Sequence, residues 1–158
     1  GVLVYMAIYV VMTLGAFACI LAMRREGGPV EEIDELAGLA KTNLPVAAAL
    51  AALMFSLAGI PPLAGFWGKY FVFLAAVKAQ LWPLAVIGVI ASVIGAYYYV
   101  RIVKIMFMDE AKPAFLPVRA STGIVIAIAG LFVVVFIAPF IAAPIFDAAE
   151  AAAKTFRY

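Results

Sequence analysis

The sequence predicts an all-α membrane protein with about four transmembrane helices, the second of which is discontinuous. Of its 158 residues, 68% are hydrophobic and 13% are charged, whereas a soluble domain is roughly 45–50% apolar and about 25% charged. The charges lie between long uncharged runs, and each run reaches the roughly 20 apolar residues that one helical crossing needs. This composition excludes a water-soluble globular protein and indicates a single membrane domain over residues 1–158.

The first crossing is expected at about residues 2–22, which carry no charge and are followed by Arg24 and Arg25. Residues 27–42 are then expected to form a surface connection. Apolar residues at positions 30, 33, 36 and 37 of this connection share one helical face, with acids opposite. That pattern predicts a short amphipathic helix on the membrane surface.

Residues 42–77 are too long for one straight crossing and too short for two crossings joined by a turn. Pro61 and Pro62 follow Gly59 and must break a helix there, since proline lacks the N–H donor and clashes with the preceding turn. Gly65 and Gly68 come directly after the break. The two possible arrangements are a hairpin that turns at the prolines and a single crossing by a discontinuous helix at about 44–78.

The basic residues favour the discontinuous helix. Lys and Arg are enriched in cytoplasmic loops, and only a single crossing at 44–78 places both basic connections on the same side. Further crossings are then expected at about 82–103 and 121–146. Tyr97–Tyr99 and the cations after them are typical of the membrane interface. The cations of the two connections are Arg24, Arg25 and Lys41 in the first, and Arg101, Lys104, Lys112 and Arg119 in the second.

Lys69 is the single charge in the interior of the predicted crossings, since Lys78 and Arg101 lie at crossing ends. At about 1.5 Å per residue it would lie roughly 10 Å past the double proline, too deep for easy extension to the interface. A lysine at such a depth costs at least about 2.5–3.5 kcal/mol and usually faces a protein interior or a water-filled cavity. Because burial disfavours its charged form, Lys69 is a candidate proton relay, and Ser56, Tyr70 and Ser92 are candidate hydroxyls for a water path. Thr13, Tyr5 and Tyr9 are further candidates.

The residue content excludes several classes of site. The chain has no histidine and one cysteine, Cys19, so it cannot supply a His/Cys metal site, a haem ligand set or an iron–sulfur cluster by itself. Cys19 is expected to be a small apolar residue in the first crossing. The net charge is +2 and the cations are scattered around the ends of the crossings, which predicts no nucleic-acid partner.

Residues 55–73, FSLAGIPPLAGFWGKYFVF, resemble the antiporter-like membrane subunits of respiratory complex I and of Mrp-type cation/proton antiporters. Residues 96–104, AYYYVRIVK, and residues 34–39, DELAGL, are similar to one branch of that family, subunit N of the bacterial NADH:quinone oxidoreductase. The resemblance implies a subunit of fourteen crossings with two inverted repeats, of which this chain matches the C-terminal part. It also implies that Lys69 serves a proton half-channel toward the far side of the membrane.

The same resemblance implies a component of a proton-translocating enzyme with no redox chemistry of its own. NADH, FMN, iron–sulfur clusters and quinone would be bound by other subunits. The implied partners are the other membrane-arm subunits and the lipid bilayer, and the implied location is the bacterial inner membrane. An Mrp-type antiporter subunit and a structural anchor that conducts nothing are the alternatives.

Overall fold

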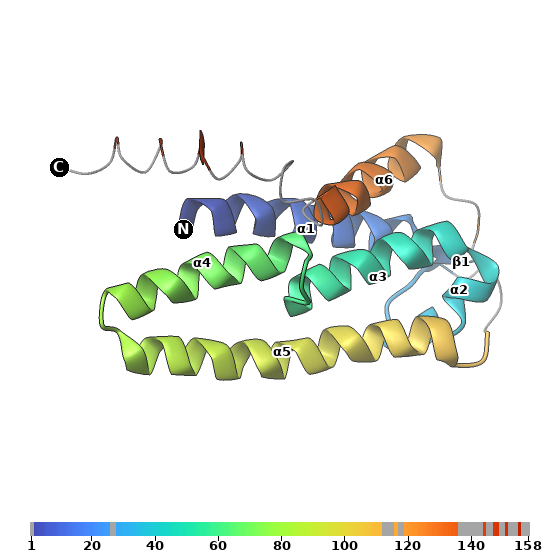
Figure 1. Ribbon diagram of the computed structural model, residues 1–158. Helices are drawn as coiled ribbons and strands as arrows, with labels where there is room; N and C mark the ends of the chain where they lie inside the picture. Colours follow the sequence, from blue (N-terminus) through green and yellow to red (C-terminus); the bar gives the residue numbers. More distant parts are fainter. Residues whose placement is uncertain are drawn as a thin grey trace.

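In a computed structural model, the chain forms an array of helices that run back and forth along one axis (Figure 1). The structure describes residues 2–25, 28–111, 116 and 119–135, and single positions 144, 147, 148, 151 and 155. The long helices are α1 (Val2–Ala22), α3 (Leu44–Ala58), α4 (Ala64–Lys78), α5 (Trp82–Met108) and α6 (Ala120–Val135).

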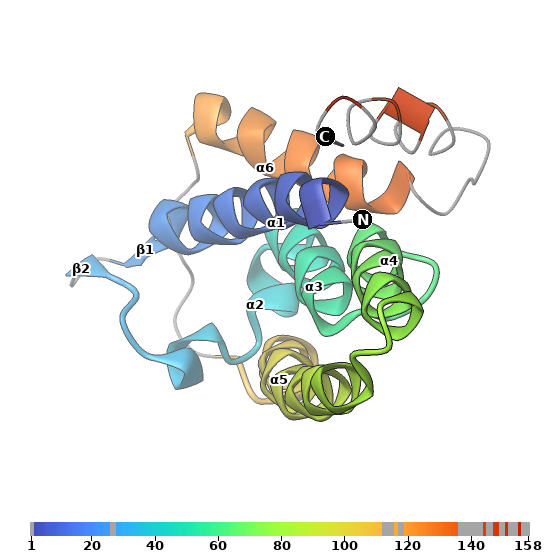
Figure 2. The ribbon, with the colours of Figure 1, turned by 90° about the vertical axis from the view of Figure 1, so that its left-hand side faces the viewer.

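The helices form layers, which Figure 2 shows nearly end-on. α6 packs against α1, α1 packs against α3 and α4, and α5 lies on the opposite side of α3 and α4. Apolar side chains of α1 and α3 fill the centre. The largest fully buried ones among them are Ile8, Met12, Cys19, Leu50 and Leu53. Cys19 is a free thiol in this core, as expected for a small apolar residue.

The second predicted crossing is interrupted between Ala58 and Ala64. α3 and α4 nevertheless run in the same direction, and α5 returns alongside both of them (Figure 1). The 27 residues of α5 rise about 40 Å, and the two 15-residue halves together follow that length. This path differs from a hairpin, in which α4 would return along α3. That the two halves cross the bilayer once stays a prediction.

The connection after α1 is compact. It holds two-residue strands, β1 (Arg24–Arg25) and β2 (Gly28–Pro29), a 3-10 helix (Ile33–Leu36) and one turn of α-helix, α2 (Leu39–Thr42). The amphipathic segment is therefore shorter and more irregular than a continuous surface helix. Leu36 is buried while Ile33 is 49% exposed, and the carboxylate of Glu35 accepts from two backbone N–H groups at the start of the 3-10 helix.

The third predicted helix was expected to end at residue 103, but α5 continues to Met108. Ile105 and Met106 are buried, and the carbonyl of Ile105 accepts from the N–H of Gly38 at 3.2 Å. These contacts with the connection extend the helix beyond its membrane-length apolar run. The fourth predicted span is α6 as far as Val135; residues 136–146 of that prediction lie outside the described residues, apart from Pro144.

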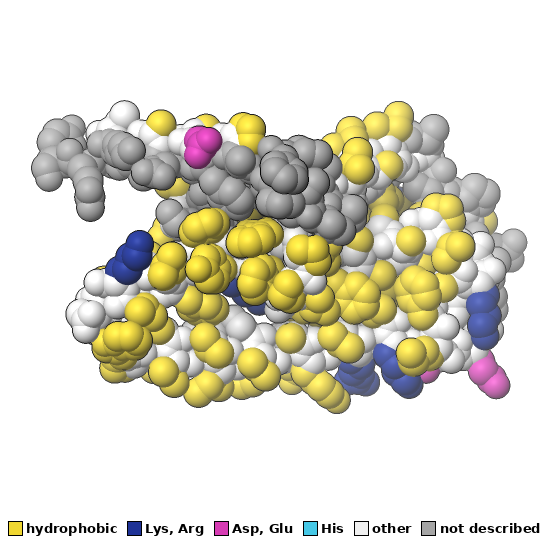
Figure 3. All heavy atoms as spheres, in the orientation of Figure 1, with side chains coloured by type: hydrophobic (Ala, Val, Ile, Leu, Met, Phe, Trp, Pro, Cys, Tyr) yellow, Lys and Arg dark blue, Asp and Glu magenta, His cyan; other side chains and the backbone are white. Residues whose placement is uncertain are grey.

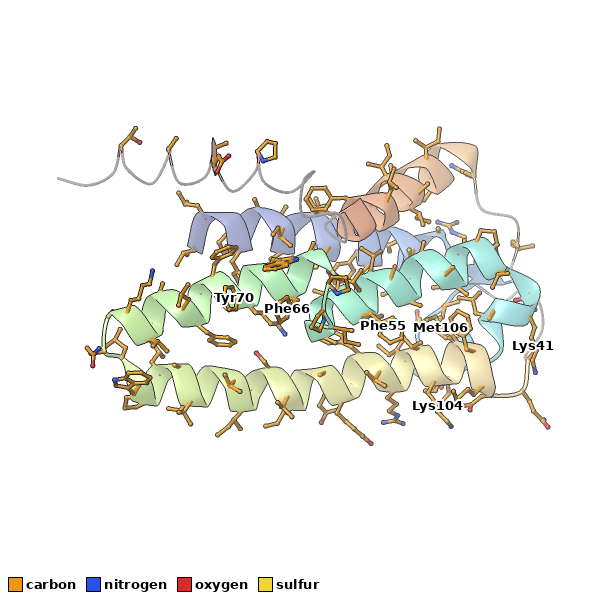
Figure 4. The ribbon with its side chains drawn as sticks, in the orientation of Figure 1. Lys41, Phe55, Phe66, Tyr70, Lys104 and Met106 are labelled. Carbon is orange, nitrogen blue, oxygen red and sulfur yellow. The ribbon has the colours of Figure 1, made fainter. Side chains whose placement is uncertain are left out.

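Basic side chains gather at one end of the helix array. Lys41 and Lys104 both lie at the end formed by α2 and the last turns of α5 (Figure 4), and Arg24 in β1 is at the same end. Figure 3 shows most of the visible Lys and Arg side chains at that end and a largely apolar surface along the helices. Among the described helices, α1 over Tyr5–Ala22 and α5 are long and apolar enough to cross a membrane, and α3 and part of α6 are shorter apolar helices.

Candidate functional site

The break between α3 and α4 is built around Gly59. This residue has φ 89° and ψ 33°, a left-handed conformation that glycine adopts without the penalty of a Cβ. The N–H of Gly59 donates to the carbonyl of Ser56 at 3.0 Å, and the N–H of Ile60 donates to that of Phe55 at 3.1 Å. This pattern closes the end of α3, yet it leaves the carbonyls of Leu57 and Ala58 without a backbone donor of that motif.

Lys69 supplies the missing donors. Its Nζ atom donates to the carbonyl of Leu57 at 2.9 Å and to that of Ala58 at 3.1 Å. A cation at the C-terminus of a helix also interacts favourably with the partial negative charge there. The sixth residue of α4 therefore completes the end of α3 across the break. The sequence alone did not identify these two carbonyls as the acceptors of Lys69.

Ser56 completes the other side of the break. Its hydroxyl oxygen accepts from the N–H of Gly65 at 2.9 Å, in the first turn of α4, and the hydroxyl donates to the sulfur of Met12 at 2.9 Å. Ser56 is fully buried. It was predicted as a water-path hydroxyl, but here both of its hydrogen bonds are made to protein groups at the break.

Two glycines allow α4 to approach its neighbours closely. A Cβ on Gly65 would overlap the carbonyl of Ser56, and a Cβ on Gly68 would lie 3.1 Å from the ring of Tyr5 in α1. Gly59, Gly65 and Gly68, the glycines predicted at the break, therefore each occupy a position where a larger side chain would strain or crowd the structure. Pro61 and Pro62 lie in the connecting turn, where the carbonyl of Pro62 accepts from the indole of Trp67 at 3.2 Å.

Two cavities border Lys69. The first, of about 380 Å³, lies between α4 and α5 and is lined mainly by apolar side chains, with Ser92 and Tyr70 also at its wall. Figure 3 shows a hollow between these two helices. Phe66 and Tyr70 lie in the half of α4 nearest the break (Figure 4), and Tyr70 is 46% exposed.

The second cavity, of about 270 Å³, lies on the side of α1 and brings three tyrosines together with Lys69. Tyr5 and Tyr9 come from α1, Tyr99 comes from α5, and Ser92 borders this cavity as well as the first. Sequence reasoning had placed Tyr99 with its neighbours in an interfacial belt. Tyr97 and Tyr98 are indeed exposed, and the separate position of Tyr99 follows from its spacing of seven residues from Ser92, which puts both on one face of α5.

Comparison with known proteins identifies the family of this chain. Residues 1–95 match the family model described as NADH:quinone oxidoreductase/Mrp antiporter, transmembrane. The chain belongs to this family. It is a membrane protein, as its apolar surface and its long apolar helices indicate.

Individual relatives support this membership. The chain is 58% identical to NADH-quinone oxidoreductase subunit N 1 of Rhizobium meliloti over 99% of its length and 62% identical to subunit N of Azorhizobium caulinodans over 98%. It spans about a third of the length of both, 32% in each case. The predicted resemblance to subunit N is confirmed by these relatives.

A solved structure shows the same fold. A chain of respiratory complex I from Thermus thermophilus, determined with bound aureothin, matches with a TM-score of 0.77 and 30% identity. The match covers 89% of the present chain and 33% of the other chain. Helix order and arrangement are therefore shared with a chain of a respiratory complex.

Proposed function

We propose that this chain takes part in proton translocation as a portion of the membrane arm of an NADH:quinone oxidoreductase in the bacterial inner membrane. The observation that supports the proposal most directly is the position of Lys69. Its amine lies at a helix break, bonded to two carbonyls and bordered by two cavities. Ionisable side chains and broken helices are typical of ion pathways in membrane proteins.

In the proposed mechanism Lys69 alternates between its protonated and neutral forms. Charge changes on neighbouring helices would drive the alternation, while other subunits bind NADH, FMN, iron–sulfur clusters and quinone. Lys69 suits this role because its partners within the break are neutral carbonyls, which stabilise the cation without the full charge of a carboxylate. A neighbouring charge can then shift the balance between the two forms.

The experiment is a Lys69→Ala substitution in the complete subunit within the assembled complex. Inverted membrane vesicles would be assayed for NADH oxidation with a short-chain quinone and for proton uptake. We expect fewer protons per NADH oxidised, with Lys78→Ala at the exposed end of the same helix as the matched control. An unchanged proton yield in the Lys69 variant would contradict the proposal.

The same assay separates the remaining functions. An Mrp-type antiporter subunit would exchange sodium for protons in vesicles without NADH oxidation. The relatives reported above are oxidoreductase subunits, which favours the first function. A purely structural anchor would leave the proton yield of Lys69→Ala at the wild-type value once assembly is equal.

A further inference from the structure

The two cavities beside Lys69 differ in what their walls offer to water. The larger one is lined mainly by apolar side chains such as Phe66, Phe73 and Leu74, with Tyr70 and Ser92 as the hydroxyls at its wall. The smaller one combines three tyrosines with Ser92. Water occupies a protein cavity when it finds two to four polar partners, whereas apolar cavities stay dry. At roughly 30 Å³ per water molecule, the 270 Å³ of the tyrosine cavity have room for several.

The hydrogen bonds of Lys69 leave one position for exchange. A protonated lysine has three N–H donors, and two of them are directed to the carbonyls of Leu57 and Ala58. After loss of one proton the neutral amine keeps two N–H groups, which can still donate to these two carbonyls. Its lone pair then points in the direction of the lost third N–H. Lys69 can therefore change its protonation state without leaving the break.

We propose that Lys69 exchanges its proton through the cavity formed by Tyr5, Tyr9, Tyr99 and Ser92, while the apolar cavity between α4 and α5 stays dry. The inference rests on the proposed function and adds the route. In one step the ammonium gives a proton to a water in this cavity and becomes an amine. Each water or tyrosine hydroxyl along the route accepts one proton and releases another, so that no group other than Lys69 changes its state.

The outer end of the route lies at Tyr9. This tyrosine is 41% exposed and its ring stacks on that of Tyr5, with centroids 5.8 Å apart. The tyrosine cavity thus reaches the surface of the described residues on the side of α1. The chain spans about a third of its relatives, and the continuation of the route would belong to elements that pack against this side.

Neighbouring tyrosines of α5 provide a matched test. Tyr99→Phe removes one hydroxyl from the cavity and keeps the ring, while Tyr98→Phe removes a hydroxyl from a side chain that is 57% exposed. With the complete complex in inverted vesicles, we expect Tyr99→Phe to lower the protons translocated per NADH toward the Lys69→Ala value. Tyr98→Phe should match wild type. Equal proton yields in the two variants, with Lys69→Ala defective, would overturn the route and leave the proposed function standing.

Cysteine accessibility tests the wet and dry sides without measuring pumping. Gly95→Cys would project into the tyrosine cavity, where a Cβ has only the Tyr99 ring at 3.8 Å, and Leu74→Cys would line the apolar cavity from a half-buried position. The native Cys19 is buried and should contribute little background in this subunit. A small cationic methanethiosulfonate reagent should modify Gly95→Cys and spare Leu74→Cys. Equal modification of both, or modification of Leu74→Cys alone, would contradict the inference.

Discussion

The two halves of the interrupted helix have the same length but lie in different surroundings. Eight of the fifteen residues of α3 are buried, whereas the three buried residues of α4 are Ala64, Gly65 and Gly68, all in its first turns. α3 contributes to the apolar core, and α4 borders both cavities. The difference indicates that α3 holds the break in place while α4 leaves space beside Lys69, as the proposed change in protonation requires.

The largest effect is expected where the two halves touch. In Gly65→Ala the new Cβ would overlap the backbone carbonyl of Ser56, whereas in Gly68→Ala its tightest contact would be the movable ring of Tyr5 at 3.1 Å. Backbone cannot yield as a side chain does, so Gly65→Ala should move α4 away from α3 and prevent assembly. Native gels of detergent-solubilised membranes would measure the assembled fraction.

The matched controls define this prediction. Gly68→Ala should assemble with a modest loss, and Gly123→Ala, which has nothing within 4 Å of the new Cβ, should assemble as wild type. Normal assembly of Gly65→Ala would show that the close approach of α4 to Ser56 is dispensable.

A smaller loss of stability is expected when a leucine in α3 or in α4 is shortened to alanine. Leu53 is fully buried in the core, and Leu53→Ala should cost about 2–5 kcal/mol. Leu74 lines the existing cavity beside α4, so Leu74→Ala should cost clearly less because fewer contacts are lost. Thermal dissociation of the purified complex would rank the two variants. The reverse ranking would mean that α4, not α3, is the more tightly packed half.

The smallest effect on stability is expected from loss of the Ser56 hydroxyl, which caps the first turn of α4. Ser56→Ala removes the acceptor of the Gly65 N–H, and loss of such a cap costs about 0.5–2 kcal/mol. Ser92→Ala, at the wall of the cavities, provides a matched serine outside the break. The same thermal assay should show a lower dissociation temperature for Ser56→Ala than for Ser92→Ala. Equal dissociation temperatures in the two variants would show that the Ser56 hydroxyl does not stabilise the break.

Much of the fold could be predicted from the sequence because membrane helices depend on local composition. Uncharged runs located α1 and α5, and Pro61 and Pro62 located the interruption. The end of α5 was missed by five residues because Ile105 and Met106 pack on the connection, a contact between segments far apart in the chain.

The candidate site was predicted only in part, because it too depends on contacts between segments that are separated in the chain. Lys69 was singled out by its charge, but its acceptors are backbone carbonyls, which every residue has and no side-chain pattern reveals. The Ser56 cap depends on how α3 meets α4. Tyr99 differs from Tyr98 in the direction its side chain takes from α5. The run of three tyrosines does not show which one faces inward, and only the seven-residue spacing of Tyr99 from Ser92 could have indicated it.

The most direct test of the central claim, that Lys69 both closes the break and exchanges a proton, is the proton yield of Lys69→Arg. Arginine offers N–H donors for the carbonyls of Leu57 and Ala58 but stays charged in proteins. We predict an assembled complex that oxidises NADH with fewer protons translocated per NADH than wild type. Lys78→Arg, on the same helix, is the control and should be normal. A wild-type proton yield in Lys69→Arg would contradict the account.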